Sequence, residues 1–167
     1  KVEFLVSKLL LILVISVVMT LFVLAGTLIL GLVNTSEVTF GMITERLGFA
    51  AGYFITVLVF QVFALFFGFL LRNTGLSIAL FTLYILIVEP IIYYFLKSPL
   101  VIKNDISTYL PANAILRITE YPAIPVLKTV MGINLQESVS LVSSLIATGY
   151  GIIMIGIVWF LLKKRDL

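Results

Sequence analysis

The sequence predicts an all-α fold, a polytopic membrane helix bundle with four transmembrane helices and an outer segment of short helices before the last one. Two observations predict it. Of the 167 residues, 62% are apolar and only 11% are charged, whereas soluble domains average about 45 to 50% apolar and about 25% charged residues. The apolar residues gather in four long runs, which lack the polar–apolar alternation of a membrane β-barrel.

Each of the four runs is long enough to cross a bilayer. A helix needs about 20 mostly apolar residues to cross about 30 Å of hydrocarbon, because each residue adds about 1.5 Å. The predicted spans cover residues 9–33, 49–71, 75–96 and 139–162. No linker or low-complexity tract divides the chain, so residues 1–167 are expected to form one transmembrane domain. Because the chain begins at Lys1 and not at Met, we expect it to be a fragment of a longer protein.

The second and third spans are predicted to form a tight antiparallel hairpin. Only residues 72–74 separate them, and so short a connection leaves the two helices no alternative to lying side by side. Direct contact between these spans is therefore the firmest tertiary prediction.

The segment of residues 97–138 is predicted to be re-entrant or interfacial. Pro111 suits the first turn of a short helix, which would place Ala114, Ile115 and Ile118 on one side. Pro122 and Pro125 end this helix, because neither has the N–H donor that a continuing helix requires. A second short helix is expected at residues 126–130. Asn134 with Glu137 resembles a helix N-cap that starts the fourth span.

The positions of the basic residues predict that both ends of the chain are cytoplasmic. If they are, the inner segments contain 6 Lys and Arg residues among 16 positions, and the outer segments contain 5 among 57. Lys and Arg are enriched in cytoplasmic segments close to the membrane. The cluster at Lys163, Lys164 and Arg165 is expected to hold the last helix at the inner surface.

The composition also excludes several classes of function. The chain has no His and no Cys. It therefore has no Cys or His zinc site, no Ser-His or Cys-His nucleophile pair, and no disulfide. We predict no catalytic residue and no metal site. The small net charge of +3 comes from residues beside apolar runs, so no nucleic-acid partner is expected, and the lipid bilayer is the expected surroundings.

Glu89 is the main candidate for a residue of a substrate pathway or gate, because it is the only acidic residue inside a span. An ionisable group in a membrane helix is expensive and is by default a functional candidate. At about 100° per residue, Thr82, Glu89 and Tyr93 share one face with Gly75. The alternative is structural: Glu89 accepts hydrogen bonds or pairs with a basic residue, while Pro90 bends the helix.

Gln61 is the second polar residue singled out, since it lies in the middle of the second span. It either joins two helices by a hydrogen bond or lines the pathway.

Small and hydroxyl-bearing residues mark expected helix contacts in the first and fourth spans. Such residues permit close approach of two helix backbones. They are Ser16, Thr20 and Thr27 in the first span and Ser140, Ser144, Thr148 and Gly151 in the fourth.

Three short motifs resemble the permease subunit of ATP-binding cassette (ABC) transporters of the type-2 exporter family. The run Lys1-Val2-Glu3-Phe4-Leu5-Val6-Ser7-Lys8 resembles the cytosolic entry to that family's third helix. Tyr109-Leu110-Pro111 resembles its outer re-entrant region. The ending Lys164-Arg165-Asp166-Leu167 resembles its basic-basic-Asp-Leu terminus.

The resemblance implies that the chain is a permease domain corresponding to helices three to six of a six-helix half-transporter in the cell inner membrane. It implies pairing with a second permease copy or sister subunit and docking of an ABC ATPase subunit, which binds ATP and Mg. The first two helices and the main coupling helix would precede Lys1. No Gly-rich phosphate-binding loop with Lys-Ser/Thr is present, so no cofactor and no ATPase activity are expected in this chain.

Other classes of function remain open from the sequence. A non-transporting four-helix membrane scaffold or immunity subunit would use the same small-residue stripes for packing. An ion-coupled carrier would use Glu89 as a titrating group. An intramembrane hydrolase needs paired catalytic groups, which a lone Glu89 does not supply.

Overall fold

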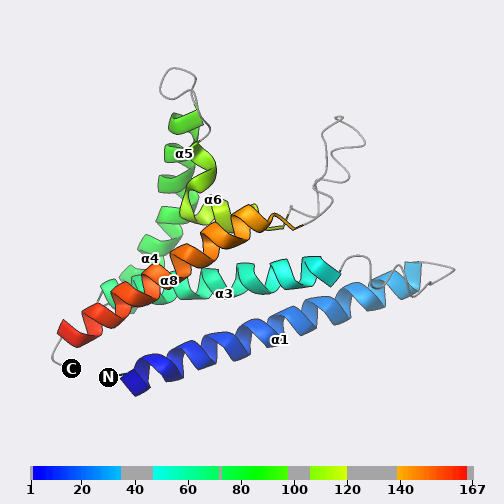
Figure 1. The fold of residues 1–167 in the computed structure, drawn as a ribbon, viewed down its shortest axis with the longest axis horizontal. Coiled ribbons are helices and arrows are strands. Elements are labelled where there is room, and N and C mark those ends of the chain that lie inside the picture. Colours follow the sequence, from blue (N-terminus) through cyan, green and yellow to red (C-terminus); the bar gives the residue numbers. More distant parts are fainter. Residues whose placement is uncertain (1, 35–46, 72, 98–105, 120–138, 165–167) are drawn as a thin grey trace.

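The computed structural model describes residues 2–34, 47–71, 73–97, 106–119 and 139–164, and these form an all-α membrane helix bundle without strands in the described ranges. The elements are α1 (Val2–Asn34), α3 (Leu47–Leu70), α4 (Thr74–Leu83), the π-helix η1 (Tyr84–Val88), α5 (Glu89–Lys97), the 3₁₀ helix η2 (Ile106–Tyr109), α6 (Pro111–Leu116) and α8 (Leu141–Lys164). Figure 1 shows their arrangement.

Four helical stretches are long and apolar enough to cross a membrane, which makes this a multi-pass membrane protein. They are Val2–Val33, Leu47–Leu70, Thr74–Leu96 and Leu141–Lys164. The first is longer than its predicted span because the helix already begins at Val2. At about 1.5 Å per residue, the 33 residues of α1 extend about 50 Å, more than the hydrocarbon thickness. Residues 2–8 therefore continue the first span as helix.

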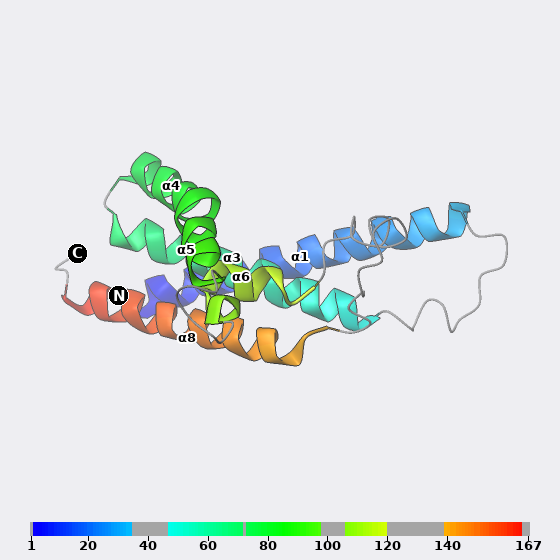
Figure 2. The same ribbon diagram turned by 90° about the horizontal axis from the view of Figure 1, so that it is seen from above.

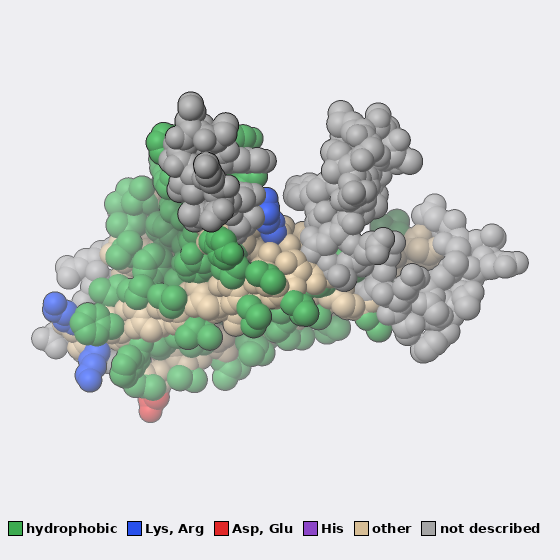
Figure 3. Space-filling model, turned by 45° about the horizontal axis from the view of Figure 1, so that its top comes forward, with side chains coloured by type: hydrophobic (Ala, Val, Ile, Leu, Met, Phe, Trp, Pro, Cys, Tyr) green, Lys and Arg blue, Asp and Glu red, His purple; other side chains and the backbone are tan. Residues whose placement is uncertain are grey.

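Helix α3 occupies the middle of the bundle, with α1 on one side and α8 on another (Figures 1 and 2). Val59, Val62 and Phe63 of α3 are buried and share a core with Ile12 of α1 and Met154 of α8. Small residues allow α8 to lie close: a Cβ atom added at Gly151 would be 3.8 Å from a Val59 methyl group. The outer faces of the long helices are apolar, as Figure 3 shows for one side.

The N-terminal end of α1 and the C-terminal end of α8 meet at the same end of the bundle (Figure 1). Val2 lines a small pocket together with Trp159, Leu162 and Lys163. Among the described residues, Figure 3 shows Lys and Arg side chains at this end of the bundle and a further one near its middle.

The predicted contact between the second and third spans is confirmed. Asn73 caps α4, and its side-chain oxygen accepts hydrogen bonds from the backbone N–H groups of Gly75 and Leu76. Further along, Phe63 and Phe67 of α3 pack against the rings of Phe81 and Tyr84, with centroids 5.5 to 5.9 Å apart. The hairpin is therefore closed by its N-cap and by an aromatic cluster.

The third span then bends away from the other helices. In η1 the backbone N–H of Glu89 donates to the carbonyl of Tyr84, five residues earlier, and Pro90 follows without a donor. Both features are established causes of helix bends. Figures 1 and 2 together show α5 running across the direction of α1, α3 and α8.

The short helix predicted at Pro111 is confirmed as α6, with proline in its first turn. Its predicted buried side is also confirmed, because Ala114, Ile115 and Ile118 are fully buried. The helix packs against α3 and α8, which places it inside the bundle. The second short helix expected at residues 126–130 and the cap expected at Asn134 and Glu137 lie outside the described residues.

Candidate functional site

Glu89 lies at the junction where the π-helix η1 ends and α5 begins. Its side chain is only 3% exposed, although the neighbouring side chains of Leu86, Ile87 and Ile91 are exposed. The bend of the third span therefore turns this one polar residue toward the protein and leaves its apolar neighbours on the outside.

One carboxylate oxygen of Glu89 is held by the start of α6. The backbone N–H of Asn113 donates to Glu89 Oε1 over 2.6 Å. Asn113 is the third residue of α6, and N–H groups in the first turn of a helix have no partner within it. The Asn113 side chain in turn donates to the Ser107 carbonyl over 2.8 Å. These bonds fix η2 and α6 against the bend in the third span.

The other carboxylate oxygen, Oε2, is buried and has no hydrogen-bond partner in the described part of the chain. The Tyr84 hydroxyl is a donor that lies near the Glu89 carboxylate, but in this arrangement Oε2 has no hydrogen-bond partner of acceptable geometry among the described residues. No ion pair of Glu89 is formed within the described ranges. The site thus presents a carboxylate with one satisfied oxygen and one unsatisfied oxygen.

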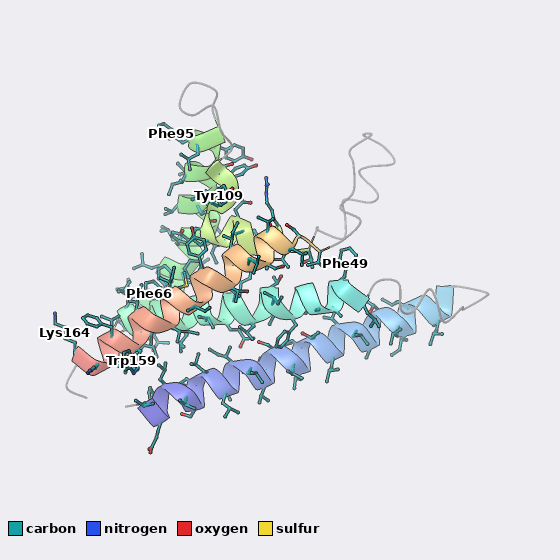
Figure 4. The ribbon with its side chains drawn as sticks, viewed as in Figure 1. Phe49, Phe66, Phe95, Tyr109, Trp159 and Lys164 are labelled. Carbon is teal, nitrogen blue, oxygen red and sulfur yellow. The ribbon has the colours of Figure 1, made fainter. Side chains whose placement is uncertain are left out.

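Helix α8 closes the site from another direction. The Tyr150 hydroxyl donates to the Tyr109 carbonyl over 2.8 Å, and Tyr109 lies between α5 and α8 (Figure 4). The Tyr109-Leu110-Pro111 motif therefore connects η2 to α6 and places the start of α6 beside Glu89.

The structure does not bring all the residues of the predicted third-span stripe together. Glu89 is buried and Tyr93 is half-buried, whereas Gly75 and Thr82 are exposed in the single chain. The π-helix explains the difference, because one extra residue in a turn rotates all later side chains by about 100° relative to a regular α-helix. The face assumed from regular α-helical spacing is broken between Thr82 and Glu89.

Gln61 faces α1, whereas Glu89 faces α6. Gln61 Nε2 donates to Ser16 Oγ over 3.3 Å, and Ser16 Oγ donates to the Ile12 carbonyl over 2.8 Å. Ser16 is fully buried. The amide thus joins the second span to the first at a distance from the bend in the third.

The residues expected at helix contacts divide into two groups. Ser16, Ser144 and Gly151 are buried, and Thr20 and Ser140 are half-buried. Thr27 and Thr148 are exposed in the single chain. Both satisfy their hydroxyl groups within their own helix, by donating to the carbonyls of Leu24 and Ser144 respectively, as such residues commonly do.

Sequence reasoning missed three residues that shape the site. Asn113 carried a usable signal, because proline at the first helical position marks the start of a helix whose N–H groups seek acceptors. Tyr150 carried none, since its contact joins segments 41 residues apart. Gly52 was also overlooked: a Cβ atom there would lie 2.8 Å from Thr119 Cγ2 and 3.0 Å from Val139 Cγ2. Because Gly52 has only a hydrogen atom as its side chain, Thr119 and Val139 can lie close to α3.

Comparisons with protein-family models, with curated proteins and with solved structures found no match. Within the described ranges, no three acidic, His or Cys residues come together as a metal site would require. The feature of the described residues that bears on function is therefore the surroundings of Glu89.

Proposed function

We propose that this chain is a permease subunit of an ATP-driven ABC exporter of the type-2 family, forming half of a translocation pathway. ATP is hydrolysed by a separate subunit, and two permease halves pair around the path. The observation that carries the proposal is the broken third span, in which a buried carboxylate lies between a π-helix and Pro90 and accepts a hydrogen bond from the short helix α6.

This geometry suits transport because non-helical or broken backbone at membrane depth is tolerated where it is enclosed by protein or lines a cavity. Transporter binding sites are often built from discontinuous helices, which supply free backbone groups and allow small rotations. π-Helical turns are frequent at functional sites. Glu89 at such a break, joined to α6 by one hydrogen bond, supports a gate that opens when α5 and α6 separate.

The proposed orientation places both ends of the chain on the cytoplasmic face of the cell inner membrane. The support is the meeting of the α1 and α8 ends and the presence there of Lys163 and Lys164, in keeping with the enrichment of basic residues in cytoplasmic segments. The same face would receive the ATPase.

Purification of the intact protein in mild detergent tests the function. We expect an ATP-hydrolysing subunit to accompany it, and we expect ATPase activity in nanodiscs to respond to substitutions at Glu89 without loss of assembly. A preparation that contains neither an ATPase partner nor nucleotide-dependent activity would contradict the proposal and would favour the scaffold or immunity subunit.

Single-cysteine labelling tests the orientation. The segment has no cysteine of its own, so in a protein otherwise free of cysteine Ser7→Cys and Lys164→Cys each create one label. We expect an impermeant maleimide to modify both from the cytoplasmic side alone. Modification of either one from the outside would overturn the orientation.

A further inference from the structure

The unsatisfied oxygen of Glu89 is the most unusual polar atom in the described part of the chain. A carboxylate oxygen buried in protein normally has a hydrogen-bond donor or a cation beside it. Here Oε1 has the Asn113 N–H, while Oε2 has no hydrogen-bond partner among the described residues. One oxygen orients the carboxylate, and the other makes no hydrogen bond in this arrangement, although the Tyr84 hydroxyl lies near the carboxylate.

One aromatic side chain, that of Tyr84, adjoins this carboxylate and connects it to an aromatic cluster. Tyr84 interacts electrostatically with Glu89 and also belongs to the cluster with Phe63, Phe67 and Phe81. The face of an aromatic ring attracts a cation, and a group of such rings offers a large apolar surface to the rest of a ligand. A carboxylate beside an aromatic cluster is a combination that recognises an ammonium group attached to an apolar body.

We propose that Glu89 Oε2 and the aromatic cluster of Phe63, Phe67, Phe81 and Tyr84 bind an amphipathic amine. The ammonium group donates to Oε2, and the apolar part lies against the rings. This inference rests on the proposed function and deepens it, because it names a class of cargo for the same site.

Access to this site requires movement of α6. Oε2 is enclosed in the described arrangement, so an amine reaches it when α6 separates from the bend in the third span. That separation breaks the Asn113–Glu89 bond, the Tyr150–Tyr109 bond and the bond from the Ser140 amide to the Ile118 carbonyl. The arrangement described here is therefore the closed state of the site.

Equilibrium binding to the intact protein in nanodiscs, without nucleotide, tests the inference. The probes are dodecylammonium and the neutral dodecanol, which share the same chain. We expect saturable binding of dodecylammonium, weakened at least about tenfold in Glu89→Gln, because a buried charge pair is strongly weakened when one charge is removed. Dodecanol should bind both proteins alike.

Glu3→Gln is the matched control, since Glu3 is an exposed carboxylate at the start of α1. We expect it to bind dodecylammonium as the unsubstituted protein does. Equal binding by Glu89→Gln, or an equal loss in Glu3→Gln, would overturn the inference. ATPase activity and export of a neutral cargo would then still stand, so failure of the inference is distinguishable from failure of the proposed function.

Hydrogen exchange in the unsubstituted protein provides a second measurement that does not depend on the folding of a variant. Dodecylammonium should alter exchange of the α6 amides, including that of Asn113, and leave the middle of α8 unchanged. Unaltered α6 exchange at a saturating amine concentration would place the amine elsewhere and refute the site.

Discussion

Gly52 offers the sharpest test of the packing, because α3, the end of the α6 segment and the start of α8 converge on it. A methyl group there would lie 2.8 Å from Thr119 Cγ2 and 3.0 and 3.1 Å from the two methyl groups of Val139. Carbon atoms normally approach to about 3.5 to 4.0 Å. Both neighbours are β-branched and therefore stiff about χ1, so relief requires backbone movement.

We expect Gly52→Ala to lower the free energy of unfolding by about 1 to 3 kcal/mol relative to a matched glycine substitution, the usual cost of overpacking. Gly68→Ala is the match: Gly68 belongs to the same helix and has no atom within 4 Å of an added Cβ. The intrinsic gain of alanine over glycine in a helix, about 0.5 to 1 kcal/mol, is shared by both and cancels.

Equilibrium unfolding in mixed micelles, followed by circular dichroism, measures the difference. Hydrogen exchange at the Ser140 amide, which donates to the Ile118 carbonyl over 3.3 Å, should accelerate in Gly52→Ala and not in Gly68→Ala. Equal stability of the two variants would refute the close approach at Gly52.

Three further substitutions test individual hydrogen bonds. Gln61→Leu removes the donor to Ser16 and should cost about 0.6 to 2 kcal/mol in the same unfolding assay; no loss would mean that the bond adds nothing to the α1–α3 contact. Asn73→Ala removes the cap of α4 and should cost about 0.5 to 2 kcal/mol, whereas Asn73→Asp should retain most of the stability. Tyr150→Phe removes the donor to the Tyr109 carbonyl and should lower the free energy of unfolding by about 0.5 to 1.5 kcal/mol. Amide hydrogen exchange in η2 should become faster, and unchanged exchange there would argue against this hydrogen bond.

The features that could be predicted from the sequence are those set by length and local pattern. The apolar runs are long enough to define helices, the three-residue connection forces the second and third spans together, and Pro111 with Ala114, Ile115 and Ile118 defines a short helix and its buried side. In each case the deciding residues lie within a few positions of one another.

The features that escaped prediction depend on contacts between distant segments or on a change of helical register. The stripe from Thr82 to Tyr93 assumed a uniform α-helix, and the π-helical turn at Tyr84–Val88 shifts that register. The close approach at Gly52 involves Thr119 and Val139, which are 20 positions apart in the sequence and far from Gly52. The sequence left open that Glu89 accepts hydrogen bonds, but the donor, Asn113, lies 24 residues away, and hydrophobic periodicity does not indicate it.

The enclosure of Glu89 also constrains the order of events during biosynthesis. The third span is synthesised before Asn113 and Tyr150, yet Asn113 supplies the hydrogen-bond donor for Glu89 and Tyr150 helps to close the surroundings. Until α8 arrives, a nascent chain carries an acidic group in a helix already committed to lipid, where such groups are costly. Truncation before α8 should leave that span poorly retained in the bilayer and expose the chain to proteolytic quality control.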